Sequence, residues 1–303
     1  MLDRQQLSIL REVDRLGSVT AAAERMNVTQ PALSHMIRKL EERHGIKIWI
    51  KHGRSLRLTQ AGEHLLALAQ RILPQLEHGE RVLTDFASGR RGALRVGMEC
   101  HPCQKWLMRV TAPYLSAWPD VDFELRTAFP LNGINALMNY EIDILITPDP
   151  VELPGLLYAP VFDYELVLAV HEDHPLASRG VAVPSDLTDE ELITYPVSFE
   201  RLDVYTQFLV PGRCRPRRHR TAETTELMLR LVAAGRGVSV VPDWLLREEG
   251  AALPLKPVRL SSEGIAKCIH LGVRSGEEDV AYIAGFLNMA RQDSPSKEAD
   301  IVG

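Results

Sequence analysis

The stretch "SVTAAAERMNVTQPALSHMIRKLEERHGIKIWIKHGRSLRL", residues 18–58, predicts two helices joined by a short turn and followed by a β-hairpin. Ser18 and Thr29 are suitable N-cap residues for the two helices, and Gly45 can end the second one in the left-handed conformation. Residues 46–58 alternate between apolar and polar side chains, as two short paired strands do. This order is typical of a winged helix-turn-helix, which places its second helix in the major groove of DNA.

The second of these helices has one apolar face and one polar face. Leu33, Ile37 and Leu40 recur at helical spacing, so we expect them to be buried. The polar face can reach base edges, and the basic hairpin suits the phosphate backbone. The residues expected to contact DNA are Thr29, Gln30, Pro31, Ser34, His35 and Arg38 of the helix, and Lys51, Arg54 and Arg57 of the hairpin.

The distribution of charge supports a DNA-binding role for this segment. Residues 1–58 hold 11 Lys and Arg against 6 Asp and Glu, although the whole chain has a net charge of −5. Residues 1–58, here called the head, are therefore basic, and the rest of the chain is acidic. This distribution indicates that only the head binds a polyanion. No apolar run approaches the ~18 residues of a membrane span, and the N-terminus lacks the apolar region of a signal peptide. We therefore expect a cytoplasmic protein whose four cysteines form no disulfide framework.

A long helix is expected over residues 59–88, directly after the basic head. At ~1.5 Å per residue this helix would be about 43 Å long, and it is too polar to be buried in one small domain. Its apolar residues lie near the a and d positions of a heptad, which indicates pairing with the same helix of a second subunit. The residues assigned to this dimer contact are Leu65, Ile72, Leu76 and Leu83.

Strand-like and helical segments alternate from Ala93 onward, as in a parallel βαβ arrangement. A second set of such segments follows, and the end of the chain can return to the first set. Two lobes joined by crossing strands would leave a cleft, with a ligand at the carboxyl ends of the strands. We expect an α/β domain over residues 92–291, with one lobe of about 92–160 and 268–291 and another of about 161–267.

The segment Cys100-His101-Pro102-Cys103 lies where the first strand of this domain meets its first helix. A helix start can hold an anionic group, and it also lowers the pKa of a thiol. The spacing is that of thiol oxidoreductases and of half a zinc site, but structural zinc needs about four ligands. Ligand contact, thiol redox chemistry and metal binding therefore remain alternatives for this segment. A thiol oxidoreductase with an incidental basic domain is the remaining alternative from another class of protein.

Residues 18–66, with "TQPALSHMIRKLE" and "LTQAGE" among them, resemble the DNA-binding domain of LysR-type transcriptional regulators. The fragments "DHPLA" (173–177) and "LVAAGRGVSVVPDW" (231–244) are similar to landmarks of the family's effector domain. The resemblance implies an N-terminal all-α winged helix-turn-helix with a long linker helix. It also implies a C-terminal α/β effector domain of two lobes, like a periplasmic binding protein.

The same resemblance implies the partners of the chain. We expect a regulator without enzymatic activity, cofactor or metal, which binds double-stranded operator DNA and RNA polymerase as a homodimer or homotetramer. The stretches "GMECHPCQKWL" (97–107), "PVFDYELVLAV" (160–170) and "YPVSFERLDVY" (195–205) resemble those of LysR-type regulators of methionine biosynthesis, which respond to homocysteine. A LysR-type regulator that senses redox state or metal through Cys100 and Cys103 is the alternative within the same fold.

Homocysteine offers a carboxylate, an ammonium and a thiol, and each group has expected partners in the sequence. The carboxylate would meet Arg201 or the helix start at His101–Cys103, and the ammonium would meet Glu99 or Asp149. The thiol would lie among Cys100, Phe129 and Phe162, with Thr147 as a hydroxyl contact. The expected effector residues are thus Glu99, Cys100, His101, Cys103, Phe129, Thr147, Asp149, Phe162 and Arg201.

Overall fold

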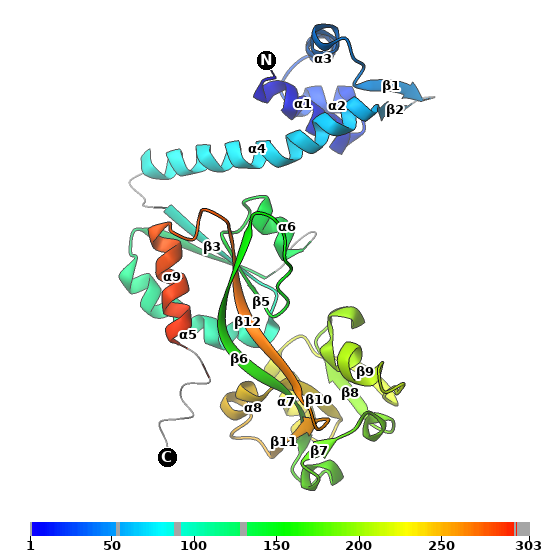
Figure 1. The fold of residues 1–303 in the computed structure, drawn as a ribbon, viewed down its shortest axis with the longest axis vertical. Helices are drawn as coiled ribbons and strands as arrows, with labels where there is room; N and C mark the ends of the chain where they lie inside the picture. The colour runs from blue at the N-terminus through cyan, green and yellow to red at the C-terminus, as the bar shows by residue number, and fades with distance from the viewer. Residues whose placement is uncertain (1, 53–54, 88–91, 128–131, 294, 296–303) are drawn as a thin grey trace. The chain divides into compact units, whose positions relative to one another are not determined.

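The computed structural model describes residues 2–52, 55–87, 92–127, 132–293 and 295. It divides the chain between residues 91 and 92 into two compact units, each of which is described by itself below (Figure 1). Within the described residues, no helix has both the length and the apolar character that crossing a membrane requires.

The N-terminal unit contains the predicted winged helix-turn-helix. Its elements are α1 (Arg4–Leu16), α2 (Val19–Arg25), α3 (Gln30–His44), and the antiparallel strands β1 (Trp49–His52) and β2 (Ser55–Leu58). The Ser18 and Thr29 side chains accept hydrogen bonds from backbone N–H groups in the first turns of α2 and α3. Gly45 ends α3 at a φ of +64°, which only glycine adopts without cost. Local capping therefore produces these helix boundaries.

The long helix α4 (Gln60–Ala87) packs against α1 of its own chain. Leu7 of α1 forms a buried cluster with Ala69 and Leu73, and Arg11 makes a 2.6 Å ion pair with Glu77. Arg4 of α1 also pairs with Glu80, so these contacts cover α4 from Ala69 to Glu80 within the protomer.

The predicted dimer contact needs a correction on this point. Leu65 packs on the cluster around Leu10 and Leu40, and Ile72 packs on the cluster of Leu7, so both face their own head. The periodicity identified an apolar face, but part of that face is covered within the chain. Leu76 and Leu83 are different, since they stay 43% and 69% exposed.

The C-terminal unit is built on one ten-stranded sheet, in the order β4-β3-β5-β12-β6-β10-β8-β9, with β11 and β7 joined beside β6. One group of strands, here lobe 1, consists of β3 (Gly92–Met98), β4 (Val121–Arg126) and β5 (Ile144–Thr147). The other group, lobe 2, consists of β7 (Val181–Ala182), β8 (Glu191–Thr194), β9 (Arg218–Thr221), β10 (Val238–Pro242) and β11 (Leu255–Leu260).

Two long strands connect the lobes, as predicted. β6 (Leu156–His171) and β12 (Ile265–Arg274) pair antiparallel along the whole length of β12 and run from one lobe into the other (Figure 1). The helices are α5 (Gln104–Ala117), α6 (Gly133–Met138) and α9 (Ala281–Gln292) in lobe 1, and α7 (Thr225–Ala233) and α8 (Asp243–Glu249) in lobe 2. The expectation of a two-lobed α/β domain is confirmed.

Candidate functional site

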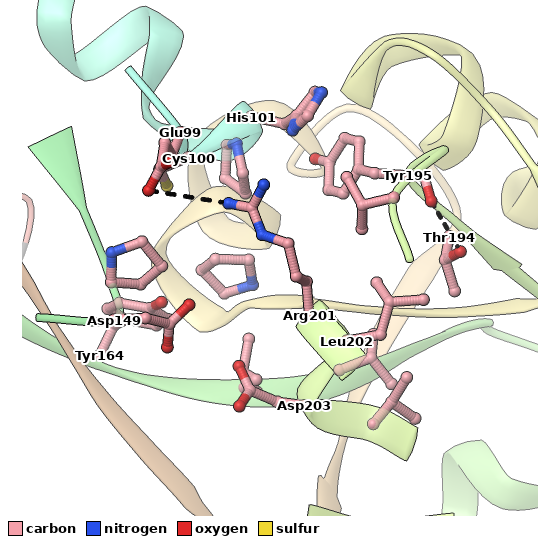
Figure 2. Close-up of a pocket in the computed structure, with 17 residues that line it drawn as sticks. Glu99, Cys100, His101, Asp149, Tyr164, Thr194, Tyr195, Arg201, Leu202 and Asp203 are labelled. Carbon is pink, nitrogen blue, oxygen red and sulfur yellow. Dashed lines mark hydrogen bonds and ion pairs between the residues drawn. The ribbon is translucent and has the colours of Figure 1, made fainter. Parts of the chain in front are cut away.

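A pocket lies between the lobes, where the carboxyl ends of β3, β5 and β8 approach one another (Figure 2). Lobe 1 supplies the ends of β3 and β5, and lobe 2 supplies the end of β8 and the turn before the π-helical segment η5 (Val204–Leu209). Its lining residues are Glu99, Cys100, His101, Pro102, Pro148, Asp149, Tyr164, Leu166, Thr194, Tyr195, Val197, Arg201, Leu202, Asp203, Val204, Val240 and Pro242. Five of the nine expected effector residues, Glu99, Cys100, His101, Asp149 and Arg201, are therefore brought together.

Glu99 and Arg201 face each other across this pocket (Figure 2). A carboxylate oxygen of Glu99 lies 3.9 Å from the Arg201 guanidinium. Glu99 also accepts a 2.8 Å hydrogen bond from the backbone N–H of Gly133, where an added Cβ would lie only 2.9 Å from the carboxylate. The Arg201 side chain is 48% exposed, against 14% for Glu99. Arg201 therefore keeps donors available for an anionic ligand, while Glu99 is held by its own chain.

Thr147 lies behind Glu99 and does not line the pocket. It is 2% exposed, and its hydroxyl donates a 3.4 Å hydrogen bond to Glu99. The same hydroxyl accepts a bond from the backbone N–H of Asp149. Thr147 thus positions Glu99 and Asp149, which corrects the expectation that it touches the effector.

A largely buried lysine joins the two lobes beside the pocket wall that Asp149 and Asp203 form. Lys267 of β12 donates hydrogen bonds to Asp149 of lobe 1 and, at 3.2 Å, to Asp203 of lobe 2. Burial acts to lower the pKa of Lys267, but the bonds and charges of both carboxylates outweigh it and raise the pKa. The lysine is therefore charged, and it balances only one of the two carboxylates. A negative charge remains on this wall.

Two stacked rings, one from each lobe, line another side of the pocket. The His101 ring stacks on Tyr195, with ring centroids 4.9 Å apart, and Tyr195 shares a 2.7 Å hydrogen bond with Thr225. Burial and the Arg201 charge lower the pKa of His101, so the neutral imidazole is favoured at pH 7. Burial likewise raises the pKa of Tyr195 and keeps its phenol protonated.

Two of the four cysteines are paired in the structure, where the sequence predicted no disulfide framework. Cys100 and Cys103 form a disulfide, with their Cα atoms 5.5 Å apart, whereas Cys214 and Cys268 are free. Cys100 lines the pocket, but Cys103 is fully buried behind it and is not an effector contact. The disulfide therefore forms part of the pocket wall.

The expected aromatic contacts to sulfur are not found in the pocket. Phe162 is 4% exposed and packs edge-on against Trp106 and Trp244, with centroids 5.3 and 5.8 Å away. It belongs to the core, on the face of β6 that packs against Trp106 of α5 and Trp244 of α8. Phe129 lies outside the described residues.

Several pocket residues were not predicted from the sequence. They are Tyr164, Thr194, Tyr195 and Asp203, and Lys267, the bonding partner of Asp149 and Asp203, was not predicted either. Thr194 ends β8 and Tyr195 follows it, so the rule that ligands bind at the ends of strands could have identified this pair. No local signal in the sequence distinguishes the others.

The expected DNA-contacting face of α3 is open to solvent. Thr29, Gln30, Pro31, His35 and Arg38 are exposed and Ser34 is half-buried, while Leu33 and Leu40 are buried. Gln30 donates a 3.0 Å hydrogen bond to Ser34, which holds both side chains on this face. Arg57 is exposed on β2, Lys51 lies on β1, and Arg54 lies outside the described residues.

Comparisons with known proteins agree with both units. Residues 4–63 match the family "Bacterial regulatory helix-turn-helix protein, lysR family", and residues 87–295 match the family "LysR substrate binding domain". The chain is 33% identical over 291 residues to the HTH-type transcriptional regulator MetR of Escherichia coli K12, covering 96% of this chain and 90% of MetR.

Solved structures show the same likeness. The regulatory domain of MetR from N. meningitidis aligns with a TM-score of 0.63 and 29% identity, over 70% of this chain and 96% of that domain. The LysR family regulator CbnR aligns over 96% of this chain and 99% of its own, with a TM-score of 0.58 and 23% identity. The second match extends the shared fold over both units.

Proposed function

The chain belongs to the LysR family of bacterial transcriptional regulators, and from this premise we propose that it controls methionine-biosynthesis genes in response to homocysteine. One observation carries the choice of ligand. The pocket presents a half-exposed arginine opposite a wall of surplus negative charge, as a zwitterionic amino acid requires. The likeness to MetR supports the choice of pathway.

Each group of the effector has a proposed partner in this arrangement. Arg201 binds the carboxylate, because its guanidinium has donors that Glu99 does not use. Asp149 and Asp203 receive the ammonium, since they share the single charge of Lys267. Asp149 is 54% exposed and is therefore the more accessible of the two. The side chain then extends toward Cys100 and the stacked rings of His101 and Tyr195.

Thermal melting of the full-length protein tests this ligand assignment. A ligand at about a hundred times its Kd stabilises the folded state by roughly 2.7 kcal/mol. Homocysteine should therefore raise the melting temperature in reducing buffer, whereas homoserine and methionine should do so much less. Equal shifts with all three, or none with homocysteine, would contradict the assignment.

For the N-terminal unit, we propose that α3 reads bases and the wing binds phosphates. Gln30→Ala should relax sequence preference at one base pair, at a cost of about 1–3 kcal/mol on the preferred site. Arg57→Ala should instead weaken all DNA sequences about equally and reduce the salt slope by about 1. Binding measured over a salt series on operator and random DNA distinguishes the two. The opposite pattern would overturn this docking.

The protein is further proposed to act in the cytoplasm as a homodimer or homotetramer, together with RNA polymerase on operator DNA. Leu76 and Leu83 support assembly, since they are exposed apolar side chains on α4. A palindromic operator needs two heads at fixed spacing, which a paired helix provides.

A second candidate function is redox sensing, and the disulfide in the pocket wall favours it. If it is correct, peroxide should change operator affinity of the wild type, and the Cys100→Ser, Cys103→Ser double variant should lose that response. If homocysteine sensing alone is correct, the double variant should still bind homocysteine and peroxide should leave operator affinity unchanged. Operator binding of both proteins under oxidising and reducing conditions decides between the two functions.

A further inference from the structure

A second groove, of about 800 Å³, lies in lobe 2 and shares no lining residue with the pocket between the lobes. Three rings gather along it: Phe199 of the 3-10 turn η4 (Phe199–Arg201), Tyr205 of η5, and His219 of β9. Their centroids are 4.8, 5.2 and 5.6 Å apart. Phe199 is nevertheless 53% exposed. The groove therefore offers an open aromatic surface that its own chain does not cover.

The turn between η5 and β9 gives this groove a positive rim. Arg213 and Arg215 are exposed there, and neither makes an ion pair with any described residue. By contrast, Arg217 on the same turn lies 3.7 Å from Glu191, which Arg218 and Arg220 also approach. Glu200 is the one acidic residue among those lining the groove in the described chain, so positive charge is in surplus.

The groove is directly linked to the pocket between the lobes. The three-residue turn η4 places Phe199 in the groove and Arg201 in the pocket. In addition, His219 of the groove shares a 2.8 Å hydrogen bond with Thr194 of the pocket. The turn and this hydrogen bond give a direct route by which a ligand on Phe199 would act on Arg201.

We propose that this groove is a second ligand site, which takes a small anion carrying an aromatic ring and modulates effector binding at Arg201. The rings supply stacking and edge contacts for a planar group, and the unpaired arginines supply forked donors for a carboxylate or phosphate. A metal ion does not suit the site, because two arginines repel it. The proposal goes beyond the function proposed above and does not depend on homocysteine being the effector.

Calorimetric titration of the full-length protein, without homocysteine, tests the site. Phenylacetate and adenosine 5′-monophosphate are the two ring-bearing anions. Benzyl alcohol and adenosine keep a ring without the charge, and acetate and inorganic phosphate keep the charge without a ring. At least one ring-bearing anion should bind, about tenfold or more tightly than either of its halves. Binding of phenylacetate would identify a carboxylate as the anionic group, and binding of adenosine 5′-monophosphate would identify a phosphate.

Variants then assign the binding to the groove. Phe199→Ala, and Arg213→Gln with Arg215→Gln, should each weaken it by about tenfold or more. Arg217→Gln is the matched control, since that arginine is already paired, and it should bind as the wild type does. Arg201→Ala should keep the ring-bearing anion while losing homocysteine, which separates failure of this site from failure of the effector assignment. Saturating the groove should change the Kd for homocysteine, or for whichever effector binds, by about fivefold or more.

Any one of the following binding results would overturn the proposal. They are no binding of either ring-bearing anion at millimolar concentration, equal binding of the uncharged compounds, wild-type affinity in the double arginine variant, and unchanged effector affinity when the groove is filled. Self-association of the wild type that Phe199→Ala abolishes would instead identify the groove as an interface between copies of the chain, and would also contradict it.

Discussion

Leu76→Glu combined with Leu83→Glu is expected to convert the full-length protein to monomers and to weaken operator binding by about 10²–10⁴-fold, the range that bivalent engagement contributes. Both leucines are exposed in the protomer, at 43% and 69%, although they continue the apolar face of α4. Glutamate at these positions places charge in the proposed helix pair. Sedimentation measures the assembly, and fluorescence anisotropy on a palindromic site measures the affinity.

The control for this experiment is Gln70→Glu. This residue is exposed on the same helix, and at 100° per residue it lies well away from the strip of Leu76 and Leu83. It adds one negative charge, as each of the two leucine substitutions does, without entering the proposed contact, so dimers and affinity should persist. Leu65 is unsuitable for substitution, because it packs on the head of its own chain. Unchanged sedimentation of the double leucine variant would exclude α4 as the assembly element.

Arg201→Ala is expected to have the second largest effect, a loss of about 2–5 kcal/mol in homocysteine binding. The substitution removes the donors for the carboxylate and leaves Glu99 at 14% exposure without its cationic neighbour. Affinity for operator DNA in the absence of effector should stay nearly unchanged, because Arg201 lies in the C-terminal unit and the DNA-contacting residues lie in the other. Calorimetric titration of homocysteine measures the loss.

A matched arginine controls for the change in charge. Arg230 of α7 lies in the same lobe, is exposed, and pairs with Glu226 one turn earlier. Arg230→Ala should leave homocysteine binding as in the wild type. Arg201→Lys should restore part of the affinity, since lysine keeps the charge but loses the forked donors. Full affinity in Arg201→Ala would mean that the carboxylate binds elsewhere.

Much of the fold could be predicted because its signals are local. Ser18, Thr29 and Gly45 define the ends of α2 and α3 through contacts within a few residues. The alternation of strands and helices likewise predicted the two-lobed domain. The sequence did not predict which residues of α4 pack within their own chain, because an apolar face does not specify what covers it. Leu65 turned out to pack within the chain.

The candidate site was predictable only where its residues are close in sequence or end a strand. Glu99, Cys100 and His101 are contiguous at the end of β3, and Asp149 follows β5. Asp203 and Lys267 are 64 residues apart and meet only through the crossing strand β12. Such pairs depend on how β6 and β12 pair with each other, and no local sequence pattern predicts that pairing.

The most direct test of the central claim is the binding curve of the full-length protein on DNA upstream of methionine-biosynthesis genes, with and without homocysteine. The account predicts that homocysteine shifts the midpoint of that curve by about 5–150-fold, the usual range of coupling between two sites. Homoserine, which lacks the thiol, should shift it far less, and Arg201→Ala should abolish the shift. Superimposed curves with and without homocysteine, or an equal shift with homoserine, would contradict the account.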